Sequence, residues 1–144
     1  MTEEISYGII PIKRGFEGAK VLLIQHRAGH WAFPKGRPNP DETPFETAQR
    51  ELLEETGLSV VDFLSEDPLW ESYTFFRSGV QVHKKVCYYL AEVRGDVVLQ
   101  TEELADCRWL PPDELAELAT FPESQKLCES IRKILSRGQK IDDK

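Results

Sequence analysis

The chain has 144 residues, and its 25 acidic side chains outnumber its 18 lysines and arginines to give a formal net charge of −7. That length predicts one domain with its own core. A composition of 40% apolar and 30% charged residues excludes disordered, collagenous and repeat chains. No apolar run approaches the roughly 20 residues that cross a bilayer, so we expect no membrane partner.

The cysteines and the first residues indicate the compartment. The three cysteines are Cys87, Cys107 and Cys128, and they form no CxxC pair. A disulfide framework and a structural zinc site are therefore not expected. The chain begins with an acidic segment where a secretory signal would be basic and then apolar, which predicts a cytoplasmic protein.

The first third of the chain reads as short strands. Residues 5–12 and 21–26 are aliphatic and flank a turn that contains Gly15 and Gly18, and residues 31–33 form a shorter candidate strand. The prolines and glycine of residues 34–41 predict a loop.

A helix is expected next. Thr43 supplies a capping hydroxyl, Pro44 occupies the first helical position and Glu46 the third, which together form a capping box. Gly57 is placed to end the helix.

The second half of the chain also shows strand and helix patterns. Two β-branched segments flank Ser78 and Gly79 and predict a hairpin, which a strand and two helices follow. The expected elements are strands over residues 70–77, 80–93 and 107–110 and helices over residues 114–119 and 123–137. We expect one domain over residues 1–137 and a flexible tail over residues 138–144.

The predicted helix carries an unusual group of glutamates. At about 100° per residue, Glu51, Glu54 and Glu55 share an arc of roughly 100° that borders the apolar stripe. Like charges at these spacings repel, more strongly beside a core, and only Arg50 is placed to offset the repulsion. Hard divalent cations remove it, since they prefer carboxylate oxygens. The residues alone support either a metal site or a solvated helix face.

The segment from Gly36 to Leu58 resembles the signature of the Nudix hydrolases, G-x5-E-x7-R-E-U-x-E-E-x-G-U with U aliphatic, at every specified position. The resemblance implies an α/β/α sandwich, with a mixed β-sheet between helices. It also implies a loop–helix–loop that binds Mg²⁺ or Mn²⁺ and cleaves a pyrophosphate linkage attached to a nucleoside. In such chemistry the metal neutralises phosphate oxygens and activates the attacking water.

The same resemblance assigns roles to single residues. The implied metal ligands are Glu51, Glu54, Glu55 and the carbonyl group of Gly36, while Arg50 orients the glutamates and Glu42 braces the loop. The proton acceptor lies on the helix or in a later loop of such enzymes, so the candidates are Glu51, Glu54, Glu102 and Glu103. Glu102 and Glu103 also fit two exposed loop acids without a catalytic role.

Three segments resemble diadenosine tetraphosphate hydrolases: residues 30–36, which some RNA pyrophosphohydrolases share, residues 83–90, and residues 120–122. Those hydrolases carry a tyrosine about sixteen to eighteen residues beyond the signature. This chain has Thr74, Phe75 and Phe76 at those positions, and Tyr73 lies one residue before them. The expected substrate-binding residues are Arg27, Lys35, His83, Lys84, Lys85, Tyr88, Tyr89 and Phe121. Strand alternation places Tyr88 and Tyr89 on opposite faces, so core packing is an equal alternative for either ring.

The resemblance predicts a metal-dependent enzyme that cleaves diadenosine tetraphosphate asymmetrically to ATP and AMP. The alternatives are a nucleoside triphosphate or RNA 5′-end pyrophosphohydrolase and, in another class, a nucleotide-binding regulator without turnover, against which the complete glutamate set argues. The charge distribution is compatible with a small polyanionic partner. Residues 41–71 carry a net charge of −9, whereas residues 12–37 carry +5 and residues 77–94 carry +3. We interpret the two basic segments as phosphate-binding candidates around an acidic metal site.

Overall fold

The computed structural model describes residues 2–142, with side chains for residues 2–137. Its strands are β1 (Thr2–Gly15), β2 (Gly18–His26), β3 (Trp31–Ala32), β4 (Lys35–Gly36), β5 (Ser59–Phe63), β6 (Leu69–Arg77), β7 (Val80–Arg94) and β8 (Leu104–Leu110). The helices are α1 (Pro44–Thr56), α2 (Leu115–Leu118) and α3 (Pro122–Asp142), and a 3₁₀ turn over Pro112–Glu114 precedes α2.

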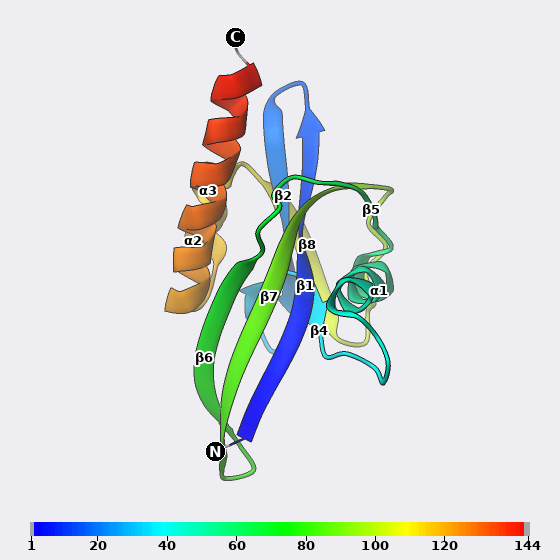
Figure 1. Ribbon diagram of the computed structural model, residues 1–144, viewed down its shortest axis with the longest axis vertical. Coiled ribbons are helices and arrows are strands. Elements are labelled where there is room, and N and C mark those ends of the chain that lie inside the picture. Colours follow the sequence, from blue (N-terminus) through cyan, green and yellow to red (C-terminus); the bar gives the residue numbers. More distant parts are fainter. Residues whose placement is uncertain (1, 143–144) are drawn as a thin grey trace.

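The strands form one mixed sheet. Its main path runs β3-β2-β1-β7-β5, with β4 paired to β1, β6 to β7 and β8 to β2. The central β1 and β7 are parallel, and the other pairs are antiparallel. Helix α1 lies on one side of the sheet, and α2 and α3 lie on the other (Figure 1). The predicted α/β/α sandwich with a mixed sheet is confirmed.

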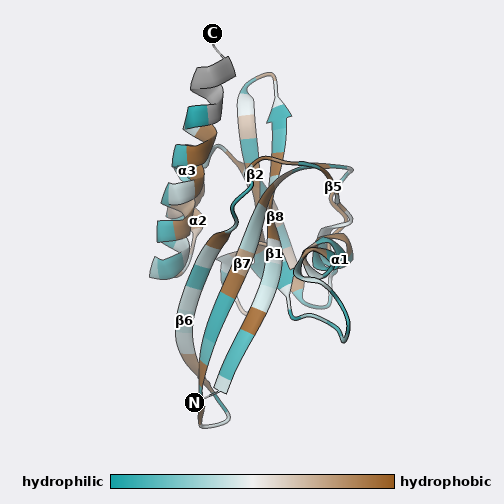
Figure 2. Cartoon of the chain, in the orientation of Figure 1, coloured by the Kyte–Doolittle hydropathy of each residue, from teal (hydrophilic) through white to brown (hydrophobic). Residues whose placement is uncertain are grey.

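Each face of the sheet has its own core, because successive side chains of a strand point to opposite faces. The side toward α3 is filled by residues that include Ile10, Leu23, Val86, Leu90, Leu127 and Ile131. The side toward α1 is filled by residues that include Ile9, Leu22, Ala48, Leu52 and Ala91. Figure 2 shows the matching pattern on α3, whose hydrophobic residues lie toward the sheet and whose hydrophilic residues lie away from it.

Two short strands depart from the sequence-based expectation. β4 occupies part of the predicted loop of residues 34–41, and it pairs with Tyr7 and Gly8 of β1. Gly8 makes this pairing feasible, since a Cβ there would overlap the carbonyl oxygen of Pro34. The edge strand β5 was not predicted, because most of its side chains are exposed and it has no clear apolar alternation.

The last helix is longer than expected. The predicted end at Arg137 is wrong, because α3 continues through Gly138 to Asp142. An internal glycine costs a helix only about 1 kcal/mol relative to alanine, so it does not stop one by itself. The remainder of the predicted tail, residues 143–144, lies outside the described residues. None of the described helices is long and apolar enough to cross a membrane.

Candidate active site

The capping box fixes where α1 begins. The backbone N–H of Glu46 donates to Thr43 Oγ1 at 3.2 Å, and the Thr43 N–H donates to Glu46 Oε1 at 3.0 Å. Gly57 ends the helix in the left-handed conformation, with φ 76°. The predicted helix and both of its caps are confirmed.

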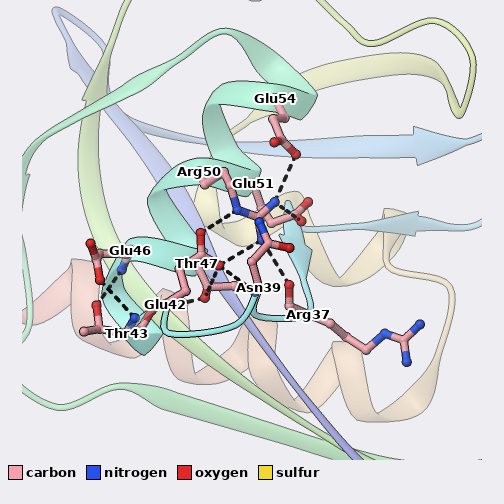
Figure 3. Close-up of polar contacts among 9 residues, drawn as sticks. All are labelled: Arg37, Asn39, Glu42, Thr43, Glu46, Thr47, Arg50, Glu51 and Glu54. Atoms are coloured by element: carbon pink, nitrogen blue, oxygen red, sulfur yellow. Dashed lines mark hydrogen bonds and ion pairs between the residues drawn. The ribbon is translucent and has the colours of Figure 1, made fainter.

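Arg50 joins the helix to the loop that precedes it (Figure 3). Its Nε donates to Glu42 Oε2 at 2.7 Å, and its Nη1 donates to Glu51 Oε1 at 2.8 Å and to Glu54 Oε2 at 3.1 Å. Its Nη2 donates to Glu42 Oε1 and to the carbonyl oxygen of Arg37, both at 3.0 Å. A planar guanidinium group alone offers this many donors in a fixed fork.

Glu42 holds the loop in place. Its carboxylate accepts from Arg50, from the Asn39 N–H at 2.9 Å and from the Thr47 hydroxyl at 2.8 Å. These hydrogen bonds, chiefly those from Arg50, lower the pKa of Glu42 to about 2. Glu42 is therefore ionised throughout the neutral range, and its contacts with Arg50, Asn39 and Thr47 are consistent with a bracing role.

Glu51 lies directly against β4. A Cβ on Gly36 would overlap the Glu51 carboxyl group, so the glycine creates the space that this side chain fills. Burial raises the pKa of Glu51, while the hydrogen bond and charge of Arg50 oppose that shift. The carboxylate of Glu51 is thus held beside the backbone of Gly36.

The other two helix glutamates differ in environment. The Glu54 side chain is 57% exposed. Glu55 is mostly buried, and within the described residues its Oε2 has no hydrogen-bond partner. Burial and the nearby charge of Glu51 raise the pKa of Glu55 to about 8, while the charge and backbone N–H of Lys35 oppose the rise. An unpartnered buried carboxylate oxygen is costly unless a ligand completes it.

These observations fit a divalent metal ion. The donor set is composed of carboxylate oxygens with the Gly36 backbone beside them, which suits hard cations such as Mg²⁺. Glu51 and Glu54 are both bonded to Arg50, and no group of three acidic, histidine or cysteine side chains in the described part of the chain stands ready to hold a metal. The unpartnered Glu55 oxygen is the feature that marks a place for one.

The loop before β8 brings Glu103 toward this group. The charge of Glu103 contributes to the raised pKa of Glu55. Its backbone is fixed by a hydrogen bond from the Glu103 N–H to Gln100 and by one from the Arg27 N–H to the Glu103 carbonyl oxygen, each 2.9 Å. The neighbouring Glu102 is exposed. Arg27 also donates through Nε to the carbonyl oxygen of Thr101 at 2.6 Å, so it lies on this loop.

A cavity of about 570 Å³ opens on the α3 side of the sheet. Its lining residues are His30, Tyr73, Thr74, Phe75, Arg77, Lys84, Phe121 and Glu123. Lys84 and Phe121 were predicted to bind substrate, and the rings of His30 and Phe121 lie 5.8 Å apart. The charge of Lys35, the residue before Gly36, acts on both Lys84 of this cavity and Glu55 of α1.

The other six residues of the cavity wall were not predicted to bind substrate. Tyr73, Phe75 and Arg77 lie on β6, whose register places Tyr73 opposite Lys84 and Phe75 opposite Val82. Directly opposed residues of an antiparallel pair lie on the same face of the sheet. The hairpin was predicted, so this pairing was the available signal, but the sequence left open which face the cavity uses.

The remaining predicted substrate-binding residues lie elsewhere. The expectation that Tyr88 stacks on a base is wrong, because its ring is 1% exposed in the core and packs edge-on against Phe33. Tyr89 packs against Phe45 and Phe63 on the α1 side. His83 and Lys85 alternate with Lys84 along β7, so they too lie on the face away from the cavity.

The sequence and the fold of this chain are similar to those of known proteins. The family model for the NUDIX domain matches residues 4–130. The chain is 37% identical over 118 residues to a bis(5′-nucleosyl)-tetraphosphatase [asymmetrical] of Rattus norvegicus, covering 79% of each protein. It is 32% identical over 112 residues to a putative mutator protein MutT4 of Mycobacterium tuberculosis, a match that covers 76% of this chain and only 44% of that relative. A crystal structure of a C. elegans Ap4A hydrolase binary complex superposes with a TM-score of 0.71 at 22% identity, covering 92% and 98% of the two chains.

Proposed function

The chain belongs to the Nudix hydrolase family and is a Nudix pyrophosphohydrolase, and we propose that its substrate is diadenosine tetraphosphate, cleaved asymmetrically to ATP and AMP. One observation carries the choice of substrate. Lys84 lines a cavity with three aromatic side chains, and the charge of Lys35, the residue before Gly36, acts on both Lys84 and Glu55. Cationic side chains beside an aromatic cavity suit a ligand with several phosphates and a base.

We propose Mg²⁺ or Mn²⁺ as the cofactor, held by Glu51, Glu54, Glu55 and the carbonyl group of Gly36. A bound divalent ion would neutralise phosphate oxygens and activate water for in-line attack. The role of Arg50 is to hold Glu51 and Glu54 in place. The candidates to take the proton of the attacking water are Glu51, Glu54, Glu102 and Glu103, and the charge of Glu103 acts on Glu55.

Lys35 and Lys84 would bind the phosphate chain. Tyr73, Phe75 and Phe121 would contact the base, since every base offers a flat face to aromatic rings. We further propose that the protein works in the cytoplasm, a reducing compartment that suits the free thiols of Cys87, Cys107 and Cys128.

A product assay tests the substrate. The protein is incubated with Mg²⁺ and, separately, with diadenosine tetraphosphate, ADP-ribose, nucleoside triphosphates and triphosphorylated RNA, and the products are separated by chromatography. We expect the highest kcat/KM for diadenosine tetraphosphate, with ATP and AMP in equal amounts. An equal or higher kcat/KM for any other compound would overturn the assignment. Glu54→Gln in the same assay should lower kcat by orders of magnitude while the protein stays folded.

A further inference from the structure

Glu4, near the start of β1, lies among three cationic side chains. Its carboxylate accepts a hydrogen bond from Arg77, and Arg37 Nη1 and Lys84 Nζ lie 3.7 Å and 3.9 Å from its oxygens. The Glu4 side chain is only 7% exposed, whereas those of Arg37 and Arg77 are 63% and 51% exposed, so Glu4 lies beneath arginines that a ligand can reach from solvent. Glu4 is therefore the common partner of cations that come from three different parts of the chain.

The sheet register creates this cluster. The parallel pairing of β1 with β7 sets Glu4 beside Lys84. Arg77 is the last residue of β6, and Arg37 directly follows β4 on the loop that Arg50 holds against the helix. The cluster is thus attached both to the cavity, which Arg77 and Lys84 line, and to the signature loop.

Positive charges outnumber negative ones among Glu4 and its three partners. One carboxylate faces three cations, and the nearby Lys35 adds a fourth positive charge that acts on Lys84. Burial and repulsion from Lys35 lower the pKa of Lys84 to about 8 even though Glu4 opposes the shift. The three cations that contact Glu4 exceed its single negative charge, and Glu123 is the other acidic side chain that lines the cavity. Arginine and lysine side chains commonly bind phosphate groups.

We propose that Arg37, Arg77 and Lys84 bind a phosphate group of the substrate beyond those flanking the cleaved bond, and that Glu4 is a specificity-determining residue that competes with that phosphate. This inference rests on the proposed function. A ligand with a short phosphate chain leaves the cations paired with Glu4. A ligand with a longer and more highly charged chain reaches them and exchanges with the carboxylate, so Glu4 reduces retention of weakly charged ligands.

Binding of inorganic tripolyphosphate, measured by calorimetry without metal, tests the phosphate site directly. Glu4→Gln removes the competing charge and should tighten binding roughly three- to tenfold, and Arg77→Gln should weaken it by a similar factor. Glu129→Gln is the matched control, because Glu129 also pairs with an arginine, Arg132, but on the exposed face of α3. It should leave the dissociation constant unchanged.

Unchanged or weaker tripolyphosphate binding by folded Glu4→Gln would overturn the inference. If that variant does not fold, Arg77→Gln decides, and binding equal to that of the unmodified protein would overturn it. The substrate assignment fails separately, in the product assay of the unmodified protein. Where both hold, Glu4→Gln should also reduce the ratio of kcat/KM for diadenosine tetraphosphate to that for ADP-ribose, since the shorter ligand gains access to the released cations.

Discussion

The backbone of Gly36 and the carboxyl group of Glu51 occupy adjoining space that leaves no room for a side chain on residue 36. The glycine thereby allows one carboxylate of α1 to lie against β4. Gly36→Ala should push Glu51 aside and lower kcat by about 100-fold, since displacements of about 1 Å in an active site cost that much. Gly15→Ala is the control, because a Cβ there meets only Gly18 O at 4.0 Å. Equal kcat for the two variants would show that the close approach is unimportant.

Arg50→Lys should lower both stability and turnover. A lysine ammonium group cannot replace a fork that bonds Glu42, Glu51, Glu54 and the carbonyl oxygen of Arg37 together. We expect a loss of about 1–3 kcal/mol in the free energy of unfolding, measured by urea titration. Arg132→Lys, at an exposed pair with Glu129, should cost less than about 0.5 kcal/mol. Similar losses at both sites would contradict a special role for Arg50.

Mg²⁺ should stabilise the protein through Glu55. Its buried Oε2 lacks a hydrogen-bond partner among the described residues, and a divalent cation would complete it. A ligand present at about 100 times its Kd stabilises the native state by about 2.7 kcal/mol, which a thermal melt detects as a higher Tm. Glu55→Gln should lose most of this Mg²⁺-dependent rise, and Glu129→Gln should retain it. A full rise in the Glu55 variant would remove Glu55 from the proposed ligand set.

The lowered pKa of Lys84 should make the free energy of unfolding depend on pH. Burial, with repulsion from Lys35, lowers its pKa in the folded protein from 10.5 to about 8. Between these two values the unfolded chain binds more protons than the folded one, so this group makes stability rise as pH rises from about 8 to 10.5. Lys84→Met should therefore be more stable than the unmodified protein at pH 7, by about 1–2 kcal/mol after allowance for screening.

That advantage of Lys84→Met should shrink as the pH approaches 10. Urea titrations of both proteins at several pH values measure the difference, in which the titration of the other groups cancels. A constant or growing advantage would show that the charge of Lys84 is not penalised in the folded state.

Phe121→Ala tests whether the cavity binds the base of the substrate. Its side chain lines the cavity and is 49% exposed, so little core packing depends on it. Loss of base stacking costs about 1–3 kcal/mol, so Phe121→Ala should raise KM for diadenosine tetraphosphate by roughly five- to 150-fold with a smaller effect on kcat. Phe16→Ala removes a fully exposed ring from the β1–β2 turn and is the control. An unchanged KM would exclude base contact at Phe121.

Local patterns in the sequence were sufficient to predict α1. The capping box, the terminal glycine and the helical period act over a few residues, so they predicted the limits of α1 and the shared arc of Glu51, Glu54 and Glu55. The same spacing carried the family resemblance, and the matched family model and the fold confirm it. The strand β4 was missed because a two-residue strand is defined by its partner in β1.

The substrate side depended on contacts between distant segments. Alternation divided the residues of β7 between two faces, but only the packing of α1 and α3 on opposite sides decided that Tyr88 and Tyr89 are packing residues and that Lys84 faces the cavity. The acidic helix could be predicted from local spacing alone, and the same spacing carried the family resemblance, which in turn implied the fold class. The tertiary structure alone brought Glu4, Arg37, Arg77 and Lys84 together, because strand register and loop position set those distances and no local pattern encodes them.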